Sequence, residues 1–482
     1  MSGTLLLGLD VGTSAVKAAV IDAHGREVAH GRARTPWASV PTGAEVDPGA
    51  LLDAAAAAGR EALEAAPEGE IAGVGIASMA ETGVLLDGRG APAVPAIAWH
   101  DSRGRDEARR MAAELGEDAF AARTGLPCSE LCTLAKYAWM RGNLPDASRG
   151  VRWLNVGEWI VRGFGGEEAA ERSLASRTGV YDLHERRPWA DALAWAEAPE
   201  SLMPDAVDAG AAMGRARAGR LGRAEGAVLT VGGHDHLSAA VGADAAGEGD
   251  VLDSSGTAEA FVRAVAPLDP EAVLRSVRRG VTVGWHAVPG RQALLGAVWA
   301  GSALARVLAL LGVDVEERHA LEALALDAEP GPLALRGIDL GALTLEGLTR
   351  DASPARLYRA ALESVGAAGA EVLRVMDAVA GEAHRRLVVT GGWAAGEAAR
   401  AVKRAHLGPF EYSPALSTGA RGAALAAGRA AGLWTIDDAP RGIGASQEAS
   451  EAMTSPSYHA TPWRTTPGAA SAAVTSPQGE AE

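Results

Sequence analysis

The segment Asp10-Val-Gly-Thr-Ser-Ala-Val-Lys17 combines residue types that can bind a phosphate group. An apolar run ends at Asp10, which predicts a buried strand followed at once by a turn. A glycine in such a turn lets the backbone approach a ligand, and N–H groups and hydroxyls can bind phosphate oxygens. The carboxylate suits Mg²⁺, which proteins hold with few oxygens beside those of the phosphate. An ordinary hairpin turn with an exposed lysine explains the segment equally well. The candidate ligands are Asp10, Gly12, Thr13, Ser14 and Lys17.

A second carboxylate stands among glycines in Thr230-Val-Gly-Gly-His-Asp-His236. Asp235 is there a candidate general base, a role that requires a carboxylate within hydrogen-bond reach of the reacting hydroxyl. The spacing of His234 and His236 is also that of a metal pair. No third ligand is apparent nearby in the sequence, so we favour a base flanked by histidines over a metal site.

Two more glycine turns follow apolar runs, in Ser254-Ser-Gly-Thr257 and in Thr390-Gly-Gly-Trp393. The second precedes a helical pattern, where a phosphate or ribose can meet the helix N-terminus. Each turn alone is a weak signal, because glycine-rich turns end many strands. Four such segments in this order predict a nucleotide site, with Gly256, Thr257, Gly391 and Gly392 as its candidates in the second half.

Alternating strands and helices must position these segments. Apolar runs predict strands over 4–10, 15–21, 26–33 and 71–77, and a helix over 48–65. The second half repeats this outline, with a strand over 249–254, a helix over 354–379 and a strand over 386–390. We therefore expect an α/β protein of two domains with a cleft between them, covering 1–245 and 246–440. The segment 441–482 is rich in small and polar residues and is predicted to be a disordered tail.

The amino-acid composition limits the classes of protein to which this chain can belong. The chain has 482 residues with 48% hydrophobic and 22% charged residues, values typical of a soluble enzyme of more than one domain. Its formal net charge of −16 argues against a nucleic-acid surface. The sequence contains no long uncharged apolar run, and a cytoplasmic enzyme without membrane contact is expected. Cys128 and Cys132 are predicted to be a buried reduced pair on one helix face.

Across residues 4–435 the chain resembles the FGGY family of carbohydrate kinases, within the actin-like ATPase superfamily. Asp10–Lys17 resembles the family's first phosphate motif, Gly233-His-Asp235 its catalytic aspartate motif and Ser255-Gly-Thr257 its second phosphate loop. Further motifs occur in the expected order: Glu45-Val-Asp-Pro48, Pro95-Ala-Ile-Ala-Trp-His-Asp-Ser-Arg103, Lys136-Tyr-Ala-Trp139, Thr390-Gly-Gly392 and Gly422-Ala-Ala424.

The resemblance implies two ribonuclease H-like domains, each with a mixed central sheet, and a ligand cleft between them. It also implies ATP and Mg²⁺ as cofactors, Asp10 as the metal residue and Asp235 as the base. It assigns the sugar side of the cleft to Met79, Glu81, Trp99, Asp101, Arg103 and His234. Glu81 stands where the family often has a histidine, which is more similar to glycerol kinases than to xylulose kinases.

The sequence therefore predicts an ATP-dependent kinase that phosphorylates a hydroxyl of a small ketose or polyol, such as a pentulose, a hexulose or glycerol. Two alternatives are an actin-like ATPase switch and a sugar-binding regulator that has lost catalysis. A homodimer is the default expectation for the assembly. Simpler explanations exist for three members of the sugar side, since Trp99 fits a core position and Asp101 with Arg103 fits a surface ion pair.

Overall fold

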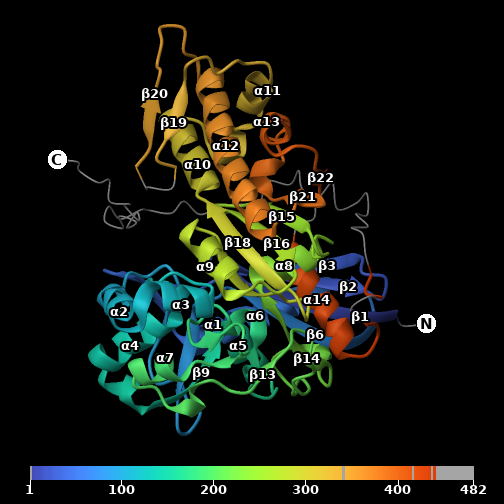
Figure 1. Cartoon of the computed structure of the whole chain (residues 1–482). Coiled ribbons are helices and arrows are strands. Elements are labelled where there is room, and N and C mark those ends of the chain that lie inside the picture. The colour runs from blue at the N-terminus through green and yellow to red at the C-terminus, as the bar shows by residue number, and fades with distance from the viewer. Residues whose placement is uncertain (1–2, 339–341, 415–416, 436–437, 441–482) are drawn as a thin grey trace, which may run out of the picture.

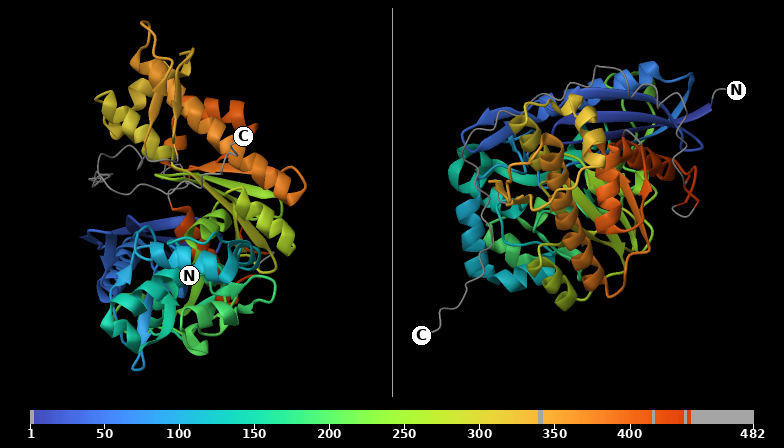
Figure 2. Two further views of the ribbon diagram at one scale, coloured as in Figure 1. Left: turned by 60° about the vertical axis from the view of Figure 1, so that its left-hand side comes forward. Right: turned by 90° about the horizontal axis from the view of Figure 1, so that it is seen from above.

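The structure is a computed structural model that describes residues 3–338, 342–414, 417–435 and 438–440. The chain forms two lobes, each built around its own central sheet (Figures 1 and 2). The lower lobe in Figure 1 contains the N-terminal half, and the upper lobe contains most of the C-terminal half. The mixed α/β architecture predicted from the sequence is confirmed. The predicted tail, residues 441–482, lies outside the described residues.

The first lobe contains a five-stranded sheet in the order β14-β6-β1-β2-β3. Strands β1, β6 and β14 are parallel, whereas β2 and β3 are antiparallel to their neighbours. The carboxyl ends of the three parallel strands therefore meet at one edge of the sheet. The bounds are β1 Gly3–Val11, β2 Ala15–Asp22, β3 Glu27–Arg34, β6 Gly69–Ser78 and β14 Val228–His234.

The second lobe contains a six-stranded sheet in the order β17-β18-β16-β15-β21-β22. Here β15, β21 and β22 are parallel, and the hydrogen bonding from β15 through β16 and β18 to β17 is antiparallel. The bounds are β15 Asp250–Ser255, β16 Glu259–Val265, β17 Thr282–Trp285, β18 Gln292–Val298, β21 Arg386–Thr390 and β22 Glu411–Tyr412.

Two long helices begin and end close to where the sequence predicts. Helix α1 spans Pro48–Ala65, with proline in its first turn and the Asp47 side chain accepting a hydrogen bond from the Ala50 N–H. Helix α12 spans Pro354–Ala380, is capped by Ser353 and ends at Gly381 in the left-handed conformation. Both helices bury an apolar stripe against their own lobe, which is why their pattern is readable from the sequence.

The last helix, α14 (Thr418–Ala430), returns to the first lobe and lies on its sheet (red in Figure 1). Glycines of the sheet allow this contact, because a Cβ on Gly8 or Gly75 would collide with the carbonyl oxygens of Ala420 and Ala423. α14 also packs against α8 (Asp235–Gly242). The predicted second domain, 246–440, thus contains one helix that completes the first lobe.

The remaining elements cover the two sheets or form small hairpins. Cys132 directly precedes α4 (Thr133–Asn143), and Cys128 lies in the loop before it. Both cysteines are free, as expected, but only Cys132 is fully buried and the two do not share a helix face. The other helices are α2 Arg105–Met111, α3 Glu117–Thr124, α4 Thr133–Asn143, α5 Val156–Gly163, α6 Arg172–Ala175, α7 Ala190–Trp195, α9 Pro270–Arg278, α10 Ala300–Leu310, α11 His319–Leu326 and α13 Glu397–Leu407. The other strands are β4 Ala38–Val40, β5 Gly43–Val46, β7 Gly83–Asp87, β8 Ala96–Ile97, β9 Gly150–Asn155, β10 Ala170–Glu171, β11 Tyr181–Asp182, β12 Arg187–Pro188, β13 Ala206–Val207, β19 Ala334–Arg336 and β20 Thr344–Glu346.

Candidate active site

Two carboxylates meet at the edge where the parallel strands of the first sheet end. Asp10 is the penultimate residue of β1, and Asp235 follows β14 directly as the first residue of α8. Strand β6 lies between them, with Asp10 beside its Ala77 and His234 beside its Ser78. Burial raises the pKa of the Asp10 carboxyl to about 7 against the opposing charge of Lys17, and the negative charge of Asp235 adds to the rise.

The Asp10 carboxylate is suited to a cation. Its Oδ1 atom is buried and has no hydrogen-bond partner among the described residues. A buried carboxylate oxygen without a partner is costly, and a hard cation with oxygen ligands would satisfy it. A Cβ on Gly419, at the start of α14, would lie 2.6 Å from the Oδ2 atom, so glycine there keeps space beside the carboxylate. The residues present therefore fit Mg²⁺.

The Asp235 carboxylate is held between two histidines. Its Oδ1 atom lies 3.2 Å from His234 Nε2 and 4.0 Å from His236 Nε2, and it accepts a hydrogen bond from the His236 N–H at 2.7 Å. Burial opposes its ionisation, but the charge of His236 and the hydrogen bond from His234 outweigh this and lower the pKa of Asp235 to about 2. Asp235 is therefore ionised and able to accept a proton.

The same three side chains have the geometry of a metal site, with ligand atoms all within 4.8 Å of one another. The lack of an apparent third ligand near the two histidines in the sequence argued against a metal; this reason is wrong, because Asp235 itself offers the third ligand atom. A transition metal held there would occupy the carboxylate that we regard as the base.

A buried network not foreseen from the sequence holds the backbone next to Asp235. The Ser173 hydroxyl accepts a hydrogen bond from the His234 N–H at 2.9 Å and donates to Glu171 Oε2 at 2.6 Å. Gly233 has a φ of +104°, and a Cβ there would lie 2.8 Å from Ser173 Oγ. All three polar residues are buried. The network fixes the direction in which the chain leaves β14, and thereby the place of Asp235.

The turn after β1 is held by two tryptophans. Trp37 Nε1 donates to the Thr13 carbonyl oxygen at 2.7 Å, and Trp99 Nε1 donates to Thr13 Oγ1 at 2.9 Å. Gly12 is half-buried and Ser14 is exposed. Trp99 is therefore more than a core residue, because it joins its own segment to the turn that follows β1.

Glu81 forms an ion pair at the boundary of the two lobes. It follows β6 with a φ of +62°, a left-handed conformation that costs a non-glycine residue about 1–3 kcal/mol. Its Oε1 atom accepts a hydrogen bond from Arg177 Nε at 2.7 Å, with 12% of the Glu81 side chain exposed. Arg177 Nη1 also donates to Thr282 Oγ1 at 2.9 Å, on strand β17 of the second sheet. The pair thus connects the first lobe to the second.

Asp101 and Arg103 form a buried ion pair, and not the surface ion pair considered above. The fully buried Asp101 carboxylate accepts hydrogen bonds from Arg103 and from the Ala44 N–H, at 2.9–3.0 Å. Arg103 also donates to Glu45. Met79 is buried, and its N–H donates to the Val11 carbonyl oxygen. Both oxygens of Asp101 are engaged within the protein, so the structure assigns it a role in positioning the segment; its predicted contact with sugar stays a prediction.

The nucleotide candidates of the second lobe also lie at the ends of neighbouring parallel strands. Ser255 ends β15, and Gly391 directly follows β21 with a φ of +102°. A Cβ on Gly391 would collide with the Ser255 backbone, so the two turns lie against each other. Thr257 is exposed, and its carbonyl oxygen accepts a hydrogen bond from the Ser302 N–H near the start of α10. Gly256 is half-buried and Gly392 is exposed.

A buried charged triad supports these turns and was not recognised in the sequence. Lys403 Nζ, on α13, donates to Asp253 Oδ2 at 2.7 Å and to Glu259 Oε1 at 2.6 Å. Asp253 also accepts a hydrogen bond from Ser255 Oγ at 3.1 Å. Lys403 therefore fixes α13 to the strands on both sides of the turn at Gly256 and Thr257.

Comparison with known proteins gives the family. Residues 5–242 match the model of the FGGY family of carbohydrate kinases, N-terminal domain. The chain is 33% identical over 451 residues to a xylulose kinase of Streptomyces coelicolor, covering 91% of this chain and 89% of that protein. The chain belongs to the FGGY family of carbohydrate kinases. It is therefore a phosphotransferase that uses ATP with Mg²⁺.

Two more relatives support this assignment. A glycerol kinase of Aromatoleum aromaticum is 30% identical over 457 residues, which cover 89% of this chain and 90% of that protein. The crystal structure of a xylulose kinase from Rhodospirillum rubrum superposes with a TM-score of 0.79 at 28% identity, covering 88% of this chain and 89% of that one. Within the part of the chain that the structure describes, no helix is long and apolar enough to cross a membrane.

Proposed function

We propose that this kinase transfers the γ-phosphate of MgATP to a hydroxyl of a small ketose or polyol, with Asp235 as the general base. The supporting observation is the pair of carboxylates at one sheet edge, whose surroundings move their pKa values in opposite directions. Such a divergence separates the roles of two carboxylates. Asp235 is the ionised member that receives a proton, and Asp10 is the member that a cation would satisfy.

The base has one carboxylate oxygen left for substrate. His234 and His236 contact the Oδ1 atom of Asp235, so the Oδ2 atom is the one we assign to the sugar hydroxyl. Hydrogen bonding to Oδ2 orients the hydroxyl oxygen toward the phosphate, and Oδ2 takes its proton during transfer. Thr13, Ser14 and Thr257 supply hydroxyls and backbone N–H groups for phosphate oxygens, and Lys17 adds a positive charge. Asp10 would hold Mg²⁺, which would supply positive charge to neutralise those oxygens.

For the substrate we propose a pentulose or a glycerol-like polyol, since the relatives include xylulose kinases and glycerol kinases. The free oxygen of the Glu81 carboxylate would accept hydrogen bonds from sugar hydroxyls. Trp99 would provide an apolar face, while Asp101 and Arg103 keep its segment in place. Met79 and His234 complete the sugar side that we propose.

For the nucleotide we propose the turns with Gly256, Thr257, Gly391 and Gly392, supported by the Lys403 triad. We further propose that the domain 1–245, completed by α14, and the rest of the domain 246–440 close on the bound substrates, which excludes water from the phosphate. A cytoplasmic location and a homodimer complete the proposal.

Replacing Asp235 tests this function. Asp235→Asn keeps the shape of the side chain but cannot accept the proton, and turnover should fall by about 10²–10⁴-fold while ATP binding is retained. Asp53→Asn, an exposed site on α1, is the matched control. Sugar-dependent ADP release over a panel of ketoses and polyols is the assay. A variant that kept more than roughly a tenth of the wild-type kcat would exclude Asp235 as the base.

The panel also tests the alternatives. ATP hydrolysis that no sugar stimulates would favour an ATPase switch. Sugar binding without ADP release would favour a regulator.

A further inference from the structure

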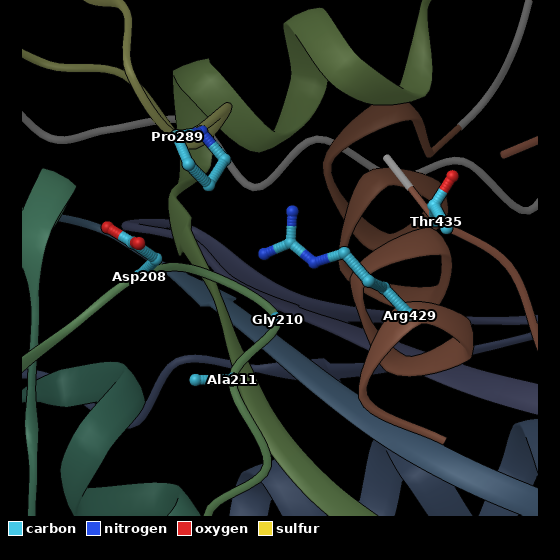
Figure 3. Close-up of a pocket in the computed structure, with 6 residues that line it drawn as sticks. All are labelled: Asp208, Gly210, Ala211, Pro289, Arg429 and Thr435. Atoms are coloured by element: carbon cyan, nitrogen blue, oxygen red, sulfur yellow. The ribbon is translucent and has the colours of Figure 1, made fainter. Parts of the chain in front are cut away.

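A pocket with a volume of about 380 Å³ lies at the junction of the two lobes (Figure 3). It is lined by Asp208, Gly210, Ala211, Pro289, Arg429 and Thr435. Asp208 follows β13 in the first lobe, Pro289 lies in the turn between β17 and β18 of the second, and Arg429 is in the last turn of α14. None of the residues assigned to phosphate transfer lines it. Its volume is within the range of pockets that bind small molecules.

The guanidinium of Arg429 points into this pocket, between Asp208 and Pro289 (Figure 3). Arg429 is half-buried, yet within the described ranges it makes no hydrogen bond and no ion pair. Burial lowers the pKa of Arg429, against the opposing charges of Asp208 and Glu171. Its five N–H donors have no acceptor within the described part of the protein, so an anionic partner in the pocket would satisfy them.

The chain keeps space for this guanidinium. Gly210 has a φ of +76°, and a Cβ there would lie 2.5 Å from Arg429 Nε. A side chain at this position would displace the arginine as well as strain the backbone. The Gly210 N–H donates to the Val231 carbonyl oxygen on β14, which fixes the wall of the pocket to the first sheet.

The charge around the pocket is locally positive in an otherwise acidic protein. Asp208 Oδ1 lies 3.0 Å from Arg172 Nε and 4.0 Å from Arg186 Nη2. These two arginines offset the negative charge of Asp208, so Asp208 does not also neutralise the positive charge of Arg429. The charges of Asp208 and of the buried Glu171 both act on Arg429, and Glu171 already accepts three hydrogen bonds, from Ser173 and Leu174. Two carboxylates thus stand against the three guanidiniums of Arg172, Arg186 and Arg429. The excess positive charge matches the dianion of a phosphate monoester.

We propose that this pocket binds a small phosphate monoester of a polyol, separate from the site of phosphate transfer. Arg429 binds the phosphate through its planar fork of N–H groups, and Asp208, with its charge offset, accepts a hydrogen bond from a hydroxyl of the same molecule. The inference goes beyond the proposed transfer reaction and does not depend on the role of Asp235.

Calorimetric titration with glycerol 2-phosphate tests the proposal. The protein is saturated with Mg²⁺ and a non-hydrolysable ATP analogue, so that phosphate groups cannot enter the proposed transfer site. The wild type is expected to bind one equivalent, Arg429→Gln to bind about tenfold or more weakly, and Arg275→Gln, on the surface of α9, to bind as the wild type does. Inorganic phosphate and glycerol serve as the two partial ligands. Asp208→Ala removes the acceptor for the hydroxyl and should remove the preference for the ester over inorganic phosphate.

Unfolding curves of each variant show whether a lost affinity reflects a lost fold. Arg429→Lys keeps the charge without the planar fork and should retain part of the binding. The proposal is overturned if the wild type does not bind the ester at millimolar concentration, or if Arg429→Gln binds it as tightly as the wild type.

Discussion

The ion pair between Glu81 and Arg177 gives a sharp prediction about specificity, because the two roles open to Glu81 can be separated. In the first role the carboxylate binds sugar hydroxyls. In the second it serves only to hold Arg177, whose other hydrogen bond reaches Thr282 in the second lobe. Both side chains of the pair are mostly buried, at 12% and 14% exposure, so solvent screens their interaction little.

The single variant Glu81→Gln removes the charge but keeps the shape. A hydrogen bond to a charged group contributes roughly 1.5–3 kcal/mol, so kcat/KM for the sugar should fall by about one to two orders of magnitude. The KM for ATP should change much less. The melting temperature should also fall, since Arg177 loses its anionic partner in a mostly buried place.

The double variant Glu81→Gln/Arg177→Met separates the roles. It removes the arginine that the single variant leaves without its partner, so part of the lost stability should return, while the sugar KM should stay high. Steady-state kinetics with each substrate varied in turn, together with thermal unfolding, measure both effects. A sugar KM that returned to the wild-type value in the double variant would show that Glu81 acts only through Arg177. An equal rise in the KM for ATP and for sugar in the single variant would also refute a sugar contact.

Three further variants probe the rest of the site. Asp10→Asn should abolish productive MgATP binding, with only partial rescue by excess Mg²⁺ in turnover assays; normal turnover would exclude Asp10 as the metal residue. Glu158 accepts hydrogen bonds from Asn155 and from the Glu171 N–H, and burial raises its pKa to about 8 from an ordinary value of 4.5. The contribution of Glu158 to stability is therefore full below pH 4.5 and is lost as the pH rises toward 8, at about 1.4 kcal/mol per pH unit. Glu158→Gln should flatten this dependence of the unfolding free energy on pH, measured by chemical unfolding. An unchanged slope would contradict the raised pKa. Lys403→Met leaves the buried carboxylates of Asp253 and Glu259 without their cation, which should cost about 3–5 kcal/mol of stability and raise the KM for ATP. An equal rise in the KM for the sugar would refute the idea that Lys403 supports the turn at Thr257.

The sequence alone determined the elements whose pattern is local. Helix α1 and strand β21 have the bounds that their periodicity and flanking residues predict. The chemical candidates were equally readable, because Asp10 ends an apolar run that predicts a buried strand and Asp235 stands among glycines in an apolar segment. Family membership followed from the order of these motifs along the chain.

Only the tertiary structure decided which of these residues meet and what their surroundings do to them. Sheet order brings Asp10 and Asp235 to the same edge of the sheet, on either side of β6, although 225 residues of chain separate them, and the charge of Asp235 contributes to the rise in the pKa of Asp10. The partners of Glu81 and Lys403 lie on other elements, so no spacing in the sequence indicates the ion pair of Glu81 or the triad of Lys403. The pairing of Asp101 with Arg103 was readable from the sequence, but its burial was not. The sequence of α14 does not indicate which lobe the helix packs on, because the glycines that allow its close contact lie on β1 and β6. Periodicity records which residues are buried, whereas the choice of partner depends on how distant surfaces pack.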